Sequence, residues 1–165
     1  MWSFKKEMYK LNNVQVLFIA CDSVANFSGD VGVYYLPVEL GSATGTVTIN
    51  YDAFSVPDRF QVFWNNSVVP IADSKLVGAV VAQPAIDALI GTYELNVFEY
   101  VNGTFTPTGL TETVNVTISD IADGSPSEPT DGAGVLTFEK DEPTPTQMVL
   151  KVIAPLGGTG WSAGV

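Results

Sequence analysis

The stretch Thr44–Trp64 reads TGTVTINYDAFSVPDRFQVFW and decides the fold. Apolar residues alternate with polar ones along Thr44–Tyr51 and again along Asp58–Trp64, which is the period of a β-strand with one buried face. A turn at Asn65 and Asn66 follows, because asparagine tolerates the positive φ angles that tight hairpins need. The stretch therefore predicts two consecutive strands of a sheet.

Similar runs recur about ten residues apart along the chain, with turn residues between them. Pro37 should confine the second half of its run to a sheet edge or a bend. Only Pro84–Ile90 suggests a helix, which Gly91 would end after one or two turns. The other expected strands are Val14–Cys21, Val31–Leu40, Ser67–Ile71, Lys75–Ala82, Glu94–Val101, Thr113–Ser119, Gly134–Lys140 and Gln147–Ala154.

Strands without intervening helices predict an all-β fold, an antiparallel β-sandwich or jelly-roll-like domain. The length of 165 residues and the 46% hydrophobic content fit one such domain with a sizeable core. We expect the domain to span residues 11–165, behind an N-terminal arm of residues 1–10. The acidic loop 120–133 is too close to the C-terminus to divide the chain, since only two strands follow it.

Two residue counts exclude most catalytic chemistry. The chain has no histidine, which removes His-based hydrolytic triads and most catalytic zinc sites, and its one cysteine removes disulfide or cysteine–metal frameworks. Glu94 and Glu99 are five residues apart on one strand and so point to opposite faces, unlike a glycosidase pair. We therefore expect no enzymatic activity, no catalytic residues and no cofactor other than a Ca²⁺ ion.

The net charge of −11 argues against nucleic-acid binding, because a polyanion needs lysine and arginine partners. The N-terminal arm Met1–Lys10 is the exception. It carries +2, so the other residues carry −13. This basic, aromatic arm could be a solvated terminus or could anchor an acidic neighbour such as another copy of the chain. The assembly contacts expected in the arm are Trp2, Phe4, Lys5, Lys6, Tyr9 and Lys10.

A second aromatic candidate lies at the other end of the chain. Gly157–Val165 suits a terminal strand or hook, and Trp161 could pack into its own domain or serve as an assembly contact in a neighbour. Near the N-terminus, the apolar stretch Val14–Ala20 before Cys21 resembles a signal sequence, but its 7 residues are at the lower limit. We interpret it as part of a buried strand, and expect neither a signal peptide nor a membrane span.

Arg59 is the only arginine and enters an otherwise apolar strand. It is expected to form a structural ion pair with Asp52, Asp58 or Asp73, because a guanidinium group binds carboxylates in a two-pronged geometry. The alternative gives the same carboxylates to Ca²⁺, but a nearby arginine would repel the cation.

The acidic loop suggests a second calcium site. Hard oxygen ligands on a glycine-rich loop suit Ca²⁺, although the spacing is not that of an EF-hand. A solvated loop that protects a sheet edge explains the same composition. The candidate ligands are Asp120, Asp123, Glu128 and Asp131.

Exposed aromatic side chains would mark a sugar-binding surface. Alternating aromatics on strands more often form core contacts than a ligand platform. The candidates are Tyr34, Tyr35, Phe63, Trp64, Phe98 and Tyr100.

Two stretches together carry a family resemblance: GTVTINYDAFSVPDRFQVFWNNSVVPIADSKLVG (Gly45–Gly78) and GVLTFEKDEPTPTQMVLKVIAPLGGTGW (Gly134–Trp161). They resemble small all-β modules of structural proteins in tailed bacteriophages. The resemblance implies a virion component, in capsid decoration, neck or tail, whose partners are other virion proteins or copies of itself. No catalytic residues accompany it. Similar modules in bacterial surface proteins keep a calcium-dependent glycan-binding module as the alternative.

Overall fold

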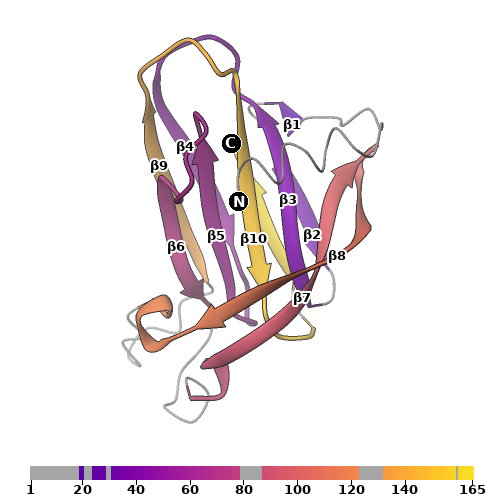
Figure 1. Ribbon diagram of the computed structural model, residues 1–165. Helices are drawn as coiled ribbons and strands as arrows, with labels where there is room; N and C mark the ends of the chain where they lie inside the picture. Colours follow the sequence, from indigo (N-terminus) through magenta and orange to yellow (C-terminus); the bar gives the residue numbers. More distant parts are fainter. Residues whose placement is uncertain (1–18, 21–23, 29–30, 79–86, 123–131, 159) are drawn as a thin grey trace.

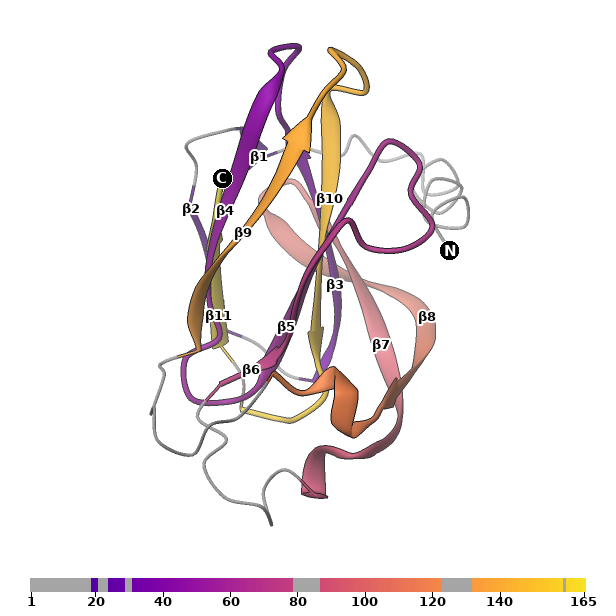
Figure 2. The same ribbon diagram turned by 90° about the vertical axis from the view of Figure 1, so that its left-hand side faces the viewer.

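The computed structural model describes residues 19–20, 24–28, 31–78, 87–122, 132–158 and 160–165, with only the backbone described for residues 19–20 and 24–28. Its strands form two sheets packed face to face (Figures 1 and 2), which confirms the all-β sandwich. The strands are β1 (Ile19–Ala20), β2 (Val24–Ser28), β3 (Gly32–Glu39), β4 (Gly45–Asp52), β5 (Asp58–Trp64), β6 (Ala72–Val77), β7 (Gly91–Val101), β8 (Thr104–Val116), β9 (Ala133–Lys140), β10 (Gln147–Ala154) and β11 (Gly160–Gly164).

The seven-stranded sheet has the order β6-β5-β10-β3-β7-β8, with β1 added beside β3, and the four-stranded sheet has the order β2-β11-β4-β9. One hydrophobic core lies between them. It receives every second residue of β3, β5 and β10 from one sheet and of β4, β9 and β11 from the other. The alternation along Thr44–Tyr51 and Asp58–Trp64 therefore marks the buried faces correctly.

Trp161 is in the middle of this core. It is 1% exposed, and its ring centroid lies 6.1 Å from those of Tyr34 and Phe60 and 5.8 Å from that of Phe105. The segment Gly157–Val165 does contain a terminal strand, β11, but this strand belongs to its own domain. The interpretation of Trp161 as an assembly contact was therefore wrong.

The sandwich is mostly antiparallel, as expected, with two parallel pairings. β7 pairs in parallel with β3, and so does β1. A parallel pair needs a long crossover, and β4, β5 and β6 provide it between β3 and β7. Pro37 is buried in the interior of the sheet, where β10 pairs with the whole of β3. It is tolerated because β7 pairs with β3 only up to Tyr35 and β1 begins at Val38, so Pro37 lies in the gap between them.

The hairpin from β5 to β6 has the turn that the sequence predicts. Asn65 and Asn66 have φ angles of 54° and 57°, and the Ser67 N–H donates to the Trp64 carbonyl at 3.2 Å. Ser67–Ile71 is not a strand, contrary to expectation. It forms an exposed loop before β6, in which the apolar run has no partner strand among the described residues.

β7 and β8 form a long hairpin, here called the ribbon. The ribbon joins the seven-stranded sheet where β7 pairs with β3, and it passes diagonally over the outer face of the other strands (Figure 1). A shift in register between Asn96 and Phe98 allows it to bend. After β8, the 3₁₀ helix Ile118–Asp120 brings the chain to β6, where Ile121 bridges Leu76. Of the predicted helix, residues 87–89 are helical, and its beginning lies outside the described residues.

Candidate functional site

Arg59 on β5 forms the predicted ion pair. Its Nε and Nη2 donate to the two carboxylate oxygens of Asp73 on β6, at 2.9 and 2.5 Å. Its Nη1 donates to Asp120 at 3.0 Å, so the guanidinium also holds the segment after the ribbon. Asp58 is fully buried at the start of β5, and Asp52 accepts a hydrogen bond from the Phe54 N–H at 2.7 Å. Of the three predicted partners, the structure pairs Asp73 with Arg59.

The charges of this cluster support one another. Burial opposes ionisation of Asp73, but hydrogen bonds from Arg59 and from the Lys75 N–H outweigh it, so the pKa of the Asp73 carboxyl is lowered. Burial likewise opposes ionisation of Asp120, and hydrogen bonds from Thr117 and Arg59 lower the pKa of its carboxyl. The hydrogen bond to Asp73 raises the pKa of Arg59 against the effect of burial. All three groups are charged at neutral pH.

A second buried ion pair lies farther along the same face. Lys151 on β10 is 5% exposed, and its ammonium group binds the Glu112 carboxylate on β8. The Tyr35 hydroxyl on β3 donates to the other oxygen of Glu112, and the Lys151 ammonium lies 5.6 Å from the centre of the Tyr35 ring. These contacts fasten the middle of the ribbon to the sheet.

The two clusters belong to one polar row across the outer face of the seven-stranded sheet. Strand register places Asp73 beside Gln61, Gln61 beside Lys151, Lys151 beside Tyr35 and Tyr35 beside Glu99. Gln61 donates to Asp73 at 3.3 Å, and Gln61 and Glu99 are 8% and 4% exposed. Glu112 of the ribbon binds Lys151 and Tyr35 of this row, so the row fastens the ribbon to the sheet.

Lys140 closes one end of the sandwich. It continues the inward-facing series of Leu136 and Phe138 on β9 and is 1% exposed. Its ammonium donates to the carbonyls of Ala43, Glu142 and Pro143 at 3.1, 2.8 and 3.0 Å. Lys140 therefore ties the loop before β4 to the loop after β9.

Asp120, the described member of the predicted calcium site, binds groups of its own chain. Asp120 uses one carboxylate oxygen for Arg59 and the other for Thr117, at 2.7 Å from the hydroxyl and 2.8 Å from the N–H. Asp123, Glu128 and Asp131 lie outside the described residues. Within the described part of the chain, no three His, Cys, Asp or Glu side chains are grouped as metal ligands. Both carboxylate oxygens of Asp120 are therefore engaged within its own chain, one by Arg59 and the other by Thr117.

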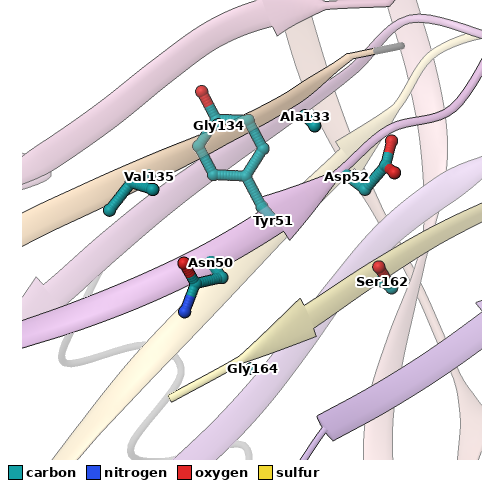
Figure 3. Close-up of a pocket in the computed structure, with 8 residues that line it drawn as sticks. All are labelled: Asn50, Tyr51, Asp52, Ala133, Gly134, Val135, Ser162 and Gly164. Carbon is teal, nitrogen blue, oxygen red and sulfur yellow. The ribbon is translucent and has the colours of Figure 1, made fainter.

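The outer face of the four-stranded sheet is different, because it holds an open hollow of about 490 Å³ (Figure 3). Strand register makes two rows there: Ser162, Asp52 and Ala133 in one, and Gly164, Asn50 and Val135 in the other. The small side chains of Ala133 and Ser162, and the absence of one at Gly164, give the hollow its depth. Asn50, Asp52 and Ser162 provide polar groups.

Tyr51 supports this hollow from the other side of β4. It belongs to the inward series with Ile49, stacks on Phe60 with centroids 4.7 Å apart, and extends across β9 over Gly134 (Figure 3). A Cβ atom at Gly134 would lie 2.2 Å from the Tyr51 hydroxyl. Glycine at 134 is therefore required by the close approach of the tyrosine. Burial raises the pKa of the Tyr51 hydroxyl.

Beyond the hollow, the same face continues as a flat polar surface. Thr46 and Thr48 of β4 lie beside Glu139 and Thr137 of β9, all exposed, and the Thr46 hydroxyl donates to Glu139. On the outward positions of β4, β9 and β11, the described side chains include two carboxylates, Asp52 and Glu139, and neither lysine nor arginine. This face presents negative charge, and none of the other described strands crosses it.

The aromatic candidates for a sugar platform belong to the folded body. Tyr34, Tyr35, Phe63 and Trp64 are at most 6% exposed, and Phe98 and Tyr100 pack against the core. The expected assembly contacts Trp2, Phe4, Lys5, Lys6, Tyr9 and Lys10 lie outside the described residues, as does Cys21.

No protein-family model, curated protein or solved structure matches this chain. In the described part of the chain, no helix has the length and hydropathy of a membrane span.

Sequence reasoning missed Glu112, Lys140 and Lys151. A signal was present for the two lysines, because each occupies an inward or covered position of a strand that is otherwise apolar. A buried lysine requires a carboxylate or several carbonyl partners. The partner of Lys151 is 39 residues away in the chain, and strand alternation alone does not identify it.

Proposed function

We propose that this chain is a non-enzymatic structural protein of a tailed-bacteriophage virion, which assembles through its basic arm with copies of itself and contacts other virion proteins. The resemblance of residues 45–161 to phage modules supports the assignment to a virion. The distribution of positive charge supports the assembly.

The observation that carries the proposal is how the body uses its cations. Outside the arm the chain has four basic residues, and three of them, Arg59, Lys140 and Lys151, are held in the ion pairs and hydrogen bonds of the fold. Lys75 is the one that is exposed. The body surface is therefore strongly acidic, and three of the chain's seven basic residues are concentrated in ten residues at its N-terminus.

Such a separation of charge favours contact between unlike parts of different copies. Bodies of like charge repel one another, whereas a basic arm and an acidic body attract. The contact joins unlike surfaces, since one copy gives its arm and another gives its body, and it is heterologous when the two copies do not exchange arms. Heterologous contacts build rings or open chains, which are the forms that virion sleeves and layers take.

Sedimentation velocity of the full chain and of a variant lacking Met1–Lys10 tests this proposal. We expect the full chain to form assemblies that dissociate as salt is raised, because the contact is electrostatic. The deletion should leave a monomer with a nearly unchanged thermal midpoint. A full chain that is monomeric at every concentration, or a deletion that assembles as before, would contradict the proposal.

A second candidate function is glycan binding, and one observation favours it. Phe54, two residues beyond Asp52 of the hollow, is 45% exposed, so an aromatic side chain and a carboxylate lie near each other on the surface. Sugar sites combine these two groups.

Calorimetry with polysaccharides, with and without a calcium chelator, separates the two functions. Heat of binding that is lost on chelation and in Phe54→Ala would favour glycan recognition. The absence of any heat of binding with the polysaccharides would favour the structural function over glycan binding.

A further inference from the structure

We propose that the outer face of the four-stranded sheet is the docking surface for the Met1–Lys10 arm of a second copy. This inference rests on the proposed function and names the two surfaces that meet. The docking surface consists of the outward residues of β4, β9 and β11, with the hollow at one end and Glu139 at the other.

The charges of the two partners match. The docking surface carries Asp52 and Glu139 and, among its described residues, no cation, while the arm carries +2. Asp52 and Glu139 each accept one hydrogen bond from their own chain, from the Phe54 N–H and the Thr46 hydroxyl. A carboxylate has two oxygens and about four acceptor positions, so each retains capacity for a lysine.

The pattern of the arm also suits a sheet face. In an extended segment alternate residues share one side, and here one side collects Trp2, Phe4, Lys6, Met8 and Lys10. The single acidic residue of the arm, Glu7, falls on the other side. An arm that binds in this form meets the sheet with apolar and basic side chains only.

The spacings agree as well. Glu139 is paired with Thr46, six residues along β4 from Asp52, which corresponds to about 20 Å. Lys6 and Lys10 are four residues apart, about 13 Å in an extended chain. The flexible four-carbon stems of two lysines span the difference.

The hollow accommodates one apolar side chain of the arm. With a volume of about 490 Å³ it is open to the surface, so a side chain can lie in it without being enclosed. Its depth comes from Ala133, Ser162 and Gly164, where a larger side chain would fill it. A tryptophan, phenylalanine or methionine from the arm would cover this small-residue surface while a neighbouring lysine reaches Asp52.

Charge reversal in the full chain tests the contact. We expect Asp52→Lys/Glu139→Lys and Lys6→Glu/Lys10→Glu each to weaken assembly by about tenfold or more in sedimentation velocity, because attraction becomes repulsion. An equimolar mixture of the two variants should assemble again, since each then offers a partner to the other. Ser162→Phe, which fills the hollow and keeps all charges, should also weaken assembly.

The matched control is Asp87→Lys/Glu94→Lys, which reverses two exposed charges before and on β7, in the other sheet. It should assemble as the unchanged protein does, and circular dichroism should show all variants folded. If Lys6→Glu/Lys10→Glu abolishes assembly while Asp52→Lys/Glu139→Lys and Ser162→Phe leave it intact, this inference is wrong and the proposed function stands.

A wild-type chain that never assembles would overturn the proposed function as well. If Asp52→Lys/Glu139→Lys then speeds proteolysis at the lysines of the arm, the arm binds the docking surface of its own chain. An unchanged rate of proteolysis would leave a different protein as the partner of the arm.

Discussion

The two outer faces of this sandwich differ in how their polar groups are used. On the seven-stranded sheet, Glu112 of the ribbon pairs with Lys151, and Asp120, just after the ribbon, pairs with Arg59. On the four-stranded sheet, the Asp52 carboxylate and the Ser162 hydroxyl line an open hollow (Figure 3). Buried and paired charges stabilise a fold, whereas exposed and uncompensated ones are available to a partner. The difference separates the face that stabilises the fold from the face that we propose as the docking surface.

The largest expected effect comes from breaking the pair on the covered face. Glu112→Ala leaves the Lys151 ammonium buried without its carboxylate, and we expect it to lower the free energy of unfolding by about 3–5 kcal/mol. Urea denaturation measures this loss. Glu112→Leu/Lys151→Met removes both charges and should be closer to the unchanged protein. A loss below about 1 kcal/mol for Glu112→Ala would mean that the ribbon does not bury Lys151.

A smaller effect is expected at the support of the open hollow. Gly134→Ala places a methyl group against the Tyr51 ring, so the tyrosine must move, at a cost of about 1–3 kcal/mol. Thermal denaturation compares it with Gly91→Ala, where nothing lies within 4 Å of the added carbon. Equal midpoints for the two variants would show that Tyr51 does not need glycine at 134.

Acid should reduce the stability that the carboxylates of the covered face, Asp73 and Asp120, contribute to the fold. The pKa values of Asp73 and Asp120 are lower in the folded protein than in the unfolded chain. Their stabilisation is therefore complete above the unfolded pKa, near 4, and is lost as the pH falls through the lower folded values. The free energy of unfolding should therefore begin to drop below about pH 5 and continue to drop as the pH falls through the folded pKa values.

Asp73→Asn provides the comparison for this acid effect. It should be less stable at neutral pH and should lose less stability across the same interval, as measured by urea denaturation at each pH. The same pH dependence in both proteins would contradict a role for the Arg59–Asp73 pair.

The smallest effect is expected on the open face. Thr48→Ala and Thr137→Ala alter exposed side chains on the flat part of the docking surface, and each should change the free energy of unfolding by no more than about 0.5 kcal/mol. Urea denaturation measures both. A loss above about 1 kcal/mol would show that this face contributes to the fold.

The sequence predicted those elements whose evidence is local. The alternation around Val47 and Ile49 and the Asn65–Asn66 turn follow from neighbouring residues, and the structure has both. The expectation that Pro37 marks a sheet edge or a bend was wrong. A proline is tolerated at this position of β3 because of where β1 and β7 pair with that strand, and this depends on distant segments of the chain.

The candidate sites show the same limit. Asp73 was within reach of sequence reasoning because it lies on the strand next to Arg59, whereas Asp120 reaches that arginine only because the ribbon crosses the sheet. Composition made Asp120 look like a calcium ligand. The hollow was not predicted at all, since it depends on small residues from three strands meeting in register.

Carboxyl-specific chemical labelling of the assembled and the dissociated full chain tests the central claim most directly. Our account predicts that assembly protects Asp52 and Glu139 on the open face and leaves Glu94, exposed on the ribbon, labelled as before. Unchanged labelling of Asp52 and Glu139 on assembly, or protection of Glu94 instead, would contradict the assignment of the four-stranded sheet as the binding face.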